Sequence, residues 1–253
     1  MNKAIKYSLI AIFWLLAWWL LSLIIGNSLL FPTPFIVFKR LGEIVITGSF
    51  WISLLTSLSR VMLGILVAIV LGAVLGLLSA KVKILYDILY PIMTVIKATP
   101  VASFIFLLVL FIGKASVPSI ITLLMVMPVV WANVYEGMMN VDKELKEVCS
   151  VYKLRAFKRF EILYLPSVLP YFTASILSSI GLGWKAGIAA EILYPPLKSI
   201  GLALQNAKQL LITEDIFAWT LVVIILSLVF ELLLKFAFKI SLSRKKGEKN
   251  ENK

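Results

Sequence analysis

The sequence predicts an all-α, polytopic membrane protein with about six transmembrane helices. Hydrophobic residues make up 61% of the 253-residue chain and charged residues only 15%, whereas a soluble domain is about half apolar and about a quarter charged. The mean hydropathy is +1.00, so lipid rather than one protein core must solvate much of the apolar surface. The apolar residues also gather in runs of about 20, the length of helix that crosses a bilayer.

Six segments are long and apolar enough to span a membrane. In chain order they are residues 7–25, 54–80, 88–112, 117–138, 167–193 and 216–240. We expect the third segment to break near residues 97–100, because a proline interrupts the hydrogen bonds of a helix. The alternative for the first segment is a cleaved signal peptide, but its apolar run is long for one and no small-x-small cleavage site follows it, so we expect a retained helix.

The connections between these spans differ in character. Residues 140–166 form the one long polar loop, and residues 35–46 form a shorter amphipathic stretch. The tail, residues 241–253, is rich in Arg, Lys, Glu and Asn and is expected to be disordered, because it has little apolar surface to bury. The chain therefore divides into a transmembrane domain, residues 1–240, and a short tail.

The distribution of Lys and Arg predicts the orientation in the membrane, because cytoplasmic loops carry an excess of both. If the N-terminus is cytoplasmic, loop 140–166 and the tail also lie inside, with most of the basic residues. Only five basic residues then lie outside: Lys39, Arg40, Lys114, Lys198 and Lys208. We therefore expect a multi-pass protein of a bacterial-type plasma membrane with both termini in the cytoplasm. Basic helix ends also account for the net charge of +12 without nucleic-acid binding.

Several kinds of catalytic site are excluded by composition. The chain has no histidine and one cysteine, Cys149, so it lacks a Ser-His-Asp triad, a histidine metal site and an internal disulfide. It also has no Gly-x-x-x-x-Gly-Lys-Ser/Thr phosphate-binding motif. We expect no catalytic residue, metal or cofactor in this chain, and no enzyme activity of its own.

Loop 140–166 is predicted to form a pair of short amphipathic helices. Asp142 is a favourable N-cap, with Glu144 in the first turn. The apolar positions recur at helical spacing on one face: Leu145, Val148, Cys149 and Tyr152. A second short helix is expected to end before Leu165-Pro166. Composition alone leaves two readings open, a helix lying on anionic lipid and a docking site for a cytosolic partner.

The spacing within this loop favours the second reading. Glu147-Val148-Cys149 is followed after three residues by Lys153, and Leu163-Tyr164-Leu165-Pro166 closes the pattern, with Asp142 and Leu145 leading in. This resembles the EAA loop of binding-protein-dependent ABC importer permeases, in which the pattern is Glu-Ala-Ala, three residues, Gly, nine residues and Ile-x-Leu-Pro. Both alanines are replaced, and Lys153 stands where the glycine belongs.

Further segments resemble the nitrate/sulfonate/taurine-type permeases of the same family. They are residues 56–61, 97–102, 166–172, 183–184, 190–191 and 199–202. Their common order and spacing carry the resemblance, which covers roughly residues 7–240.

The resemblance implies a function and a set of partners. The loop would form coupling helices that seat in a cytosolic ATPase subunit, which binds ATP and Mg²⁺ and drives the transmembrane helices between inward- and outward-facing states. The implied coupling residues are Asp142, Glu144, Leu145, Glu147, Val148, Cys149, Lys153, Leu165 and Pro166. A homodimer in the lipid bilayer would receive its substrate from an extracytoplasmic substrate-binding protein. The substrate would be a small sulfonate-, nitrate- or taurine-like anion, with a vitamin precursor as the alternative.

Two other classes of function remain as alternatives. A self-contained secondary transporter would need internal repeats and ion ligands near the middle of the membrane, and no repeat is visible in the sequence. A membrane scaffold or biogenesis factor without transport activity is the other.

Small residues recur every four positions in two of the predicted spans. The second span contains Gly64, Gly72 and Gly76, and the fifth contains Ser179, Gly183 and Gly187. Such ridges let helices pack closely in lipid. We also raise the hypothesis that the fifth-span ridge forms a homodimer seam.

Three charged residues lie in or near the outward halves of the spans: Arg60, Lys185 and Glu191. Charges inside a membrane are costly and face a partner or a water-filled cavity. They are therefore expected either to form ion pairs or to line a translocation path for an anionic substrate.

Overall fold

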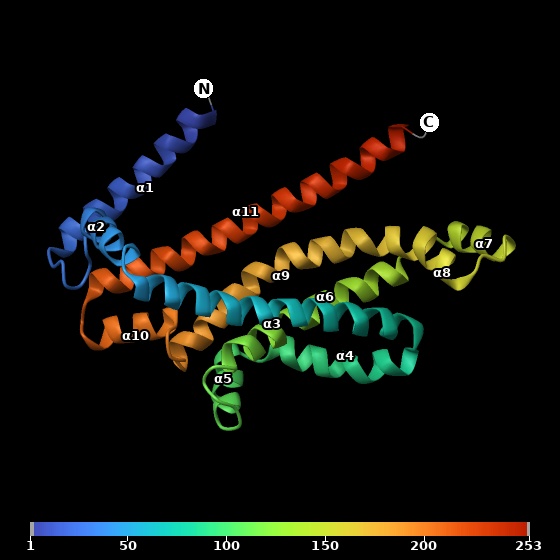
Figure 1. The fold of residues 1–253 in the computed structure, drawn as a ribbon, viewed down its shortest axis with the longest axis horizontal. Helices are drawn as coiled ribbons and strands as arrows, with labels where there is room; N and C mark the ends of the chain where they lie inside the picture. The colour runs from blue at the N-terminus through green and yellow to red at the C-terminus, as the bar shows by residue number, and fades with distance from the viewer. Residues whose placement is uncertain (1–2, 252–253) are drawn as a thin grey trace.

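The computed structural model describes residues 3–251, and every regular element in this range is a helix (Figure 1). In chain order these are α1 (Lys3–Ile25), α2 (Pro34–Val45), α3 (Gly48–Lys81), α4 (Lys83–Ala98), α5 (Val101–Val109), α6 (Val117–Met139), α7 (Lys143–Val151), α8 (Ala156–Arg159), the π-helical turn η1 (Phe160–Tyr164), α9 (Leu165–Leu193), α10 (Ile200–Gln209) and α11 (Thr213–Glu251). All six predicted spans and the amphipathic helix α2 are present.

Five helices are long and apolar enough to cross a membrane, and the pair α4 and α5 makes a sixth span if its two arms count together. The two arms are bent by 101°, which confirms the predicted break. Thr99 ends α4 in an extended conformation, φ −79° and ψ 130°. This follows from Pro100, because the residue before a proline is disfavoured in the helical region.

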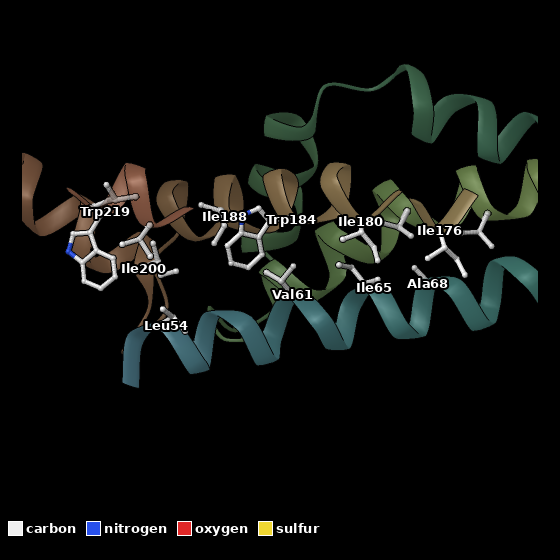
Figure 2. Close-up of a cluster of buried hydrophobic side chains, with 14 of the residues drawn as sticks. Leu54, Val61, Ile65, Ala68, Ile176, Ile180, Trp184, Ile188, Ile200 and Trp219 are labelled. Carbon is white, nitrogen blue, oxygen red and sulfur yellow. The ribbon is translucent and has the colours of Figure 1, made fainter. Parts of the chain in front are cut away.

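The core is formed by α3, α6 and α9, which pack along one another (Figure 1). Figure 2 shows Val61 and Ile65 of α3 meeting Ile180 and Trp184 of α9 in the main buried cluster. The glycines of α3 lie directly against α6. A Cβ atom at Gly72 would come within 2.8 Å of the Met127 carbonyl oxygen, so the two backbones approach to a distance that only glycine allows.

The small residues of α9 face the interior of the same chain. Ser179 is fully buried, and a Cβ atom at Gly183 would lie 2.8 Å from Val126 Cγ2 of α6. At Gly187 it would lie 2.6 Å from Thr122 Oγ1. The hypothesis of a homodimer seam along this ridge is therefore wrong, because α3 and α6 already occupy it.

Two further differences from the sequence-based expectation concern the last third of the chain. The segment after α9 contains α10, which was not predicted, although Ser199 caps it by accepting a hydrogen bond from the Leu202 N–H at 3.0 Å. The tail, expected to be disordered from Ser241, instead continues α11 as helix to Glu251. Lys and Glu are good helix formers, and they follow an already formed helix. The last two residues lie outside the described part.

Candidate functional site

The loop predicted to couple to a partner lies at the end of the molecule formed by α7 and α8, far from α10 (Figure 1). As predicted, Asp142 caps α7, since its carboxylate accepts a hydrogen bond from the Glu144 N–H at 2.8 Å. On the inner side, Cys149 packs with Val141 and Leu163 in a small buried cluster. Cys149 therefore anchors α7 and is not part of an outward apolar face, which corrects the expectation for this residue.

The outer side of this loop carries apolar side chains that are half or more exposed in the described chain. We call them the end patch: Leu145, Val148, Val151, Tyr152 and Phe157. Val148 is 50% exposed and Phe157 80% exposed. Several large exposed apolar side chains on one short loop are typical of an interaction site.

Lys153 adopts the backbone conformation that the glycine of the pattern would favour. Its φ is +46°, in the left-handed region. The Lys153 N–H donates to the Ser150 carbonyl at 3.0 Å, and the Leu154 N–H donates to the Cys149 carbonyl at 3.2 Å. These two hydrogen bonds form a Schellman motif, which ends helices and normally has glycine at this position. The tight turn between α7 and α8 is thus made despite the missing glycine.

The second helix of the loop does not end before Leu165-Pro166, contrary to the prediction. It passes through η1 into α9 without a break. Pro166 cannot donate the hydrogen bond that a regular α-helix requires. The π-helical turn just before it accommodates this loss, because its bonds reach five residues back, as in the Leu165 N–H to the Phe160 carbonyl. Motion of the loop is therefore joined directly to the span α9.

At the opposite end, Arg60 and Glu191 form a buried ion pair. Glu191 is 0% exposed, and its Oε1 lies 3.6 Å from Arg60 Nη1. Glu191 Oε2 accepts hydrogen bonds from Ser57 Oγ at 2.6 Å and from the Gly201 N–H at 3.4 Å. The carboxylate thus joins α3, α9 and the start of α10, where the helix dipole favours a negative charge.

Sequence reasoning missed the contribution of Ser57 and Gly201 to this cluster. Both lie in segments that carry the family resemblance, but nothing in their spacing links them to Glu191. Arg60 Nη2 also donates to the Leu197 carbonyl at 3.1 Å. A Cβ atom at Gly201 would lie 2.2 Å from the Glu191 carbonyl carbon, so this close approach requires glycine.

Lys185 lies apart from the Arg60–Glu191 pair. Its side chain is exposed and lines a cavity of about 410 Å³ between α9 and α11, together with Ser178, Ser227 and Glu231. The structure therefore does not bring Arg60 and Lys185 into one basic lining.

The α10 end also contains a polar cavity of about 380 Å³ between α2, α10 and the start of α11. Arg40 lies in its wall and forms ion pairs with Glu43 and Asp215. Hydrogen bonds to these two carboxylates raise the pKa of Arg40 above its ordinary value. Within residues 3–251, no cluster of acidic or cysteine side chains has the geometry of a metal site.

Comparison with known proteins identifies the family. The profile of the family described as "Binding-protein-dependent transport system inner membrane component" matches residues 68–247. The putative aliphatic sulfonates transport permease protein SsuC of Bacillus subtilis is 24% identical over 194 residues, which cover 76% of this chain and 70% of that protein. The bicarbonate transport system permease protein CmpB of Synechococcus elongatus is 32% identical over 84 residues, 33% of this chain and 30% of that protein.

The family profile covers well over half of the chain and includes α6, α7, α9 and α10 in full. The relatives have the same character, since both are named as transport permeases. The chain therefore belongs to the family of inner membrane components of binding-protein-dependent transport systems, and it is the permease of an ABC importer.

Proposed function

We propose that this permease is driven by a cytosolic ATPase subunit that docks on the end patch and holds the ATP and Mg²⁺. The observation that carries the proposal is the apolar exposure of Val148, Tyr152 and Phe157 on a loop with the coupling-loop spacing. Covering such surface contributes about 25 cal/mol per Å². The continuous path from α8 through η1 into α9 supplies the mechanical link, because a displaced loop carries the span with it.

We also propose an orientation that follows from this docking. The α7 end faces the cytoplasm, with both termini on that side, as the Lys and Arg bias predicts. The polar cavity between α2, α10 and α11 then faces outward, where an extracytoplasmic substrate-binding protein delivers its cargo. The Arg60–Glu191 pair holds α10 in place at this entrance, so Arg60 serves as a structural partner and not as a free charge on the path.

The proposed substrate is a small organic anion of the sulfonate kind. Support comes from the relatives, which are named for aliphatic sulfonates and for bicarbonate. Lys185 also supports an anionic substrate, because an exposed ammonium within a span must face water or a partner. Ser178 and Ser227 line the same cavity with hydroxyl groups. A second copy of the chain placed against this face would enclose the path in a homodimer. Nitrate- and taurine-like anions fit the same lining, and a vitamin precursor is the alternative cargo.

Co-purification with a candidate ATPase subunit that is co-expressed with this chain tests the docking. Val148→Asp places a charge in the end patch and should reduce both co-purification and stimulated ATP hydrolysis at least about tenfold, the effect of losing about 1.4 kcal/mol. Ile46→Asp is the matched control, since Ile46 is 84% exposed at the opposite end. Equal loss in both variants, or none in Val148→Asp, would contradict docking at the patch. Binding to anionic vesicles that depends on Val148 while ATPase binding does not would favour the lipid reading.

A further inference from the structure

A cavity of about 330 Å³ lies between α4 and α6 and has an aromatic wall. It is separate from the Arg60–Glu191 pair and from the cavity beside Lys185. Its lining includes Tyr86, Tyr90 and Lys97 of α4, and Trp131, Tyr135 and Glu136 of α6. A volume of this size accommodates a single-ring solute.

Three of these rings form a near-parallel stack. The ring centroids of Tyr86 and Tyr135 are 4.3 Å apart at an interplanar angle of 18°, and those of Tyr86 and Trp131 are 5.7 Å apart at 19°. Trp131 is fixed from behind, because its indole N–H donates to Ser79 Oγ at 3.0 Å in the buried interior. The three rings therefore line the cavity in one near-parallel orientation, with Trp131 held in place by a hydrogen bond.

Tyr90 differs from the three stacked rings in its tilt and its exposure. It leans on Tyr86 at 37° with 5.4 Å between centroids, and it is 52% exposed. A half-exposed ring beside a fixed stack is suited to cover the second face of a bound aromatic ring.

The cavity also holds one charge of each sign. Lys97 lies at the end of α4 and Glu136 in the last turn of α6, and neither belongs to the ion pairs found in the described part of the chain. Lys97 lies seven residues after Tyr90, about two helical turns along the same face of α4, and both side chains line the cavity. Charges within spans are retained where they face water or a ligand.

We propose that this cavity binds a flat aromatic solute with an anionic group and an amino group. The anionic group meets the Lys97 ammonium, the ring lies against the stack under Tyr90, and the amino group donates to the Glu136 carboxylate. An aminobenzenesulfonate has these three features. The inference rests on the proposed transport of small organic anions and narrows that substrate class, because an aliphatic sulfonate has no ring to lie against the aromatic stack.

Equilibrium binding to the full-length chain in lipid nanodiscs tests the cavity without partner subunits. The probe is radiolabelled 4-aminobenzenesulfonate, with benzenesulfonate and ethanesulfonate as competitors. We expect Tyr90→Ala and Lys97→Gln each to weaken probe binding about fivefold or more, the effect of one ring or charge contact. Tyr90→Phe should retain binding, since it keeps the ring. Glu136→Gln should reduce the preference for the amino-substituted probe over benzenesulfonate.

Two matched controls lie outside the cavity. Tyr7→Ala removes an exposed tyrosine of α1, and Lys208→Gln removes an exposed lysine of α10; both should bind the probe normally. Probe binding that is unchanged in Tyr90→Ala and Lys97→Gln, or no stronger than that of ethanesulfonate, overturns the inference.

ATP-driven uptake by the assembled transporter is measured separately. Uptake of ethanesulfonate without cavity-dependent probe binding leaves the proposed function standing, whereas cavity-dependent binding without any uptake refutes that function alone.

Discussion

Replacing Glu191 by methionine should loosen α10 from α3 and α9, because it leaves the Arg60 guanidinium, whose side chain is only 19% exposed, without its partner. The carboxylate accepts from Ser57 and Gly201 and lies 3.6 Å from the Arg60 guanidinium. Removing one member of a buried ion pair costs about 3–5 kcal/mol, since the other charge stays desolvated. The double variant Glu191→Met with Arg60→Met removes both charges and should cost only about 1–3 kcal/mol, the effect of leaving the Ser57 O–H and the Gly201 N–H without an acceptor. The Ser57 oxygen still accepts from the Ile200 N–H at 2.9 Å.

Both quantities are measurable on the purified full-length chain. The free energy of unfolding comes from denaturant titration in mixed micelles, and hydrogen exchange of residues 200–209 reports on α10 alone. We expect the double variant to be about 2 kcal/mol more stable than Glu191→Met, with slower exchange in α10. A double variant as unstable as Glu191→Met would refute the reasoning, because the buried charge would then not be the source of the loss.

Two further substitutions test the turn and the core. Lys153→Gly should stabilise the loop by about 0.5–1 kcal/mol. The substitution relieves a left-handed φ that costs a residue with a side chain about 1–2 kcal/mol. Part of that gain is lost, because glycine has more conformational entropy in the unfolded chain. Lys146→Gly, in the middle of α7, should instead destabilise by about 1 kcal/mol; amide exchange in α7 separates the two, and equal signs would contradict the turn assignment. Gly72→Ala should lower the free energy of unfolding by about 1–3 kcal/mol, because the added methyl group overpacks against Met127 and Val130. At Gly181 an added Cβ meets no atom within 4 Å, so Gly181→Ala should be neutral or should stabilise by up to about 1 kcal/mol through helix propensity. A similar loss in both glycine variants would show that helix contact is not the cause.

The six spans could be predicted because length and apolar content suffice to identify a transmembrane helix. The break at residues 97–100 followed from Pro100 for an equally local reason. The direction of each side chain could not be predicted in the same way. A span is apolar on all sides, so polarity does not distinguish the face toward lipid from the face toward the core. The small residues of α9 were for this reason assigned to a second copy, although α3 and α6 cover them.

Parts of the candidate site could be predicted where the interacting residues are close in the sequence, as in the helix cap at Asp142. It was not predictable where residues far apart in the sequence meet. The contact of Ser57 with Glu191 joins two helices separated by more than a hundred residues, and no periodicity records it. Cys149 shows the same limit, because it is buried with Val141 and Leu163 while Leu145 and Val148 of the same helix stay about half exposed.

The bend between α4 and α5 has a consequence for how the molecule divides mechanically. The outer arm, α5, is attached through Ile105, which packs on Ala186 and Ala190 of α9 and on the start of α6 in a cluster that shares no buried residue with the main core. A rotation of α5 about Thr99 therefore disturbs only this minor cluster. The bundle thus has a stiff frame and one separately hinged arm, and such an arm is free to reorient when its neighbours tilt without unpacking the frame.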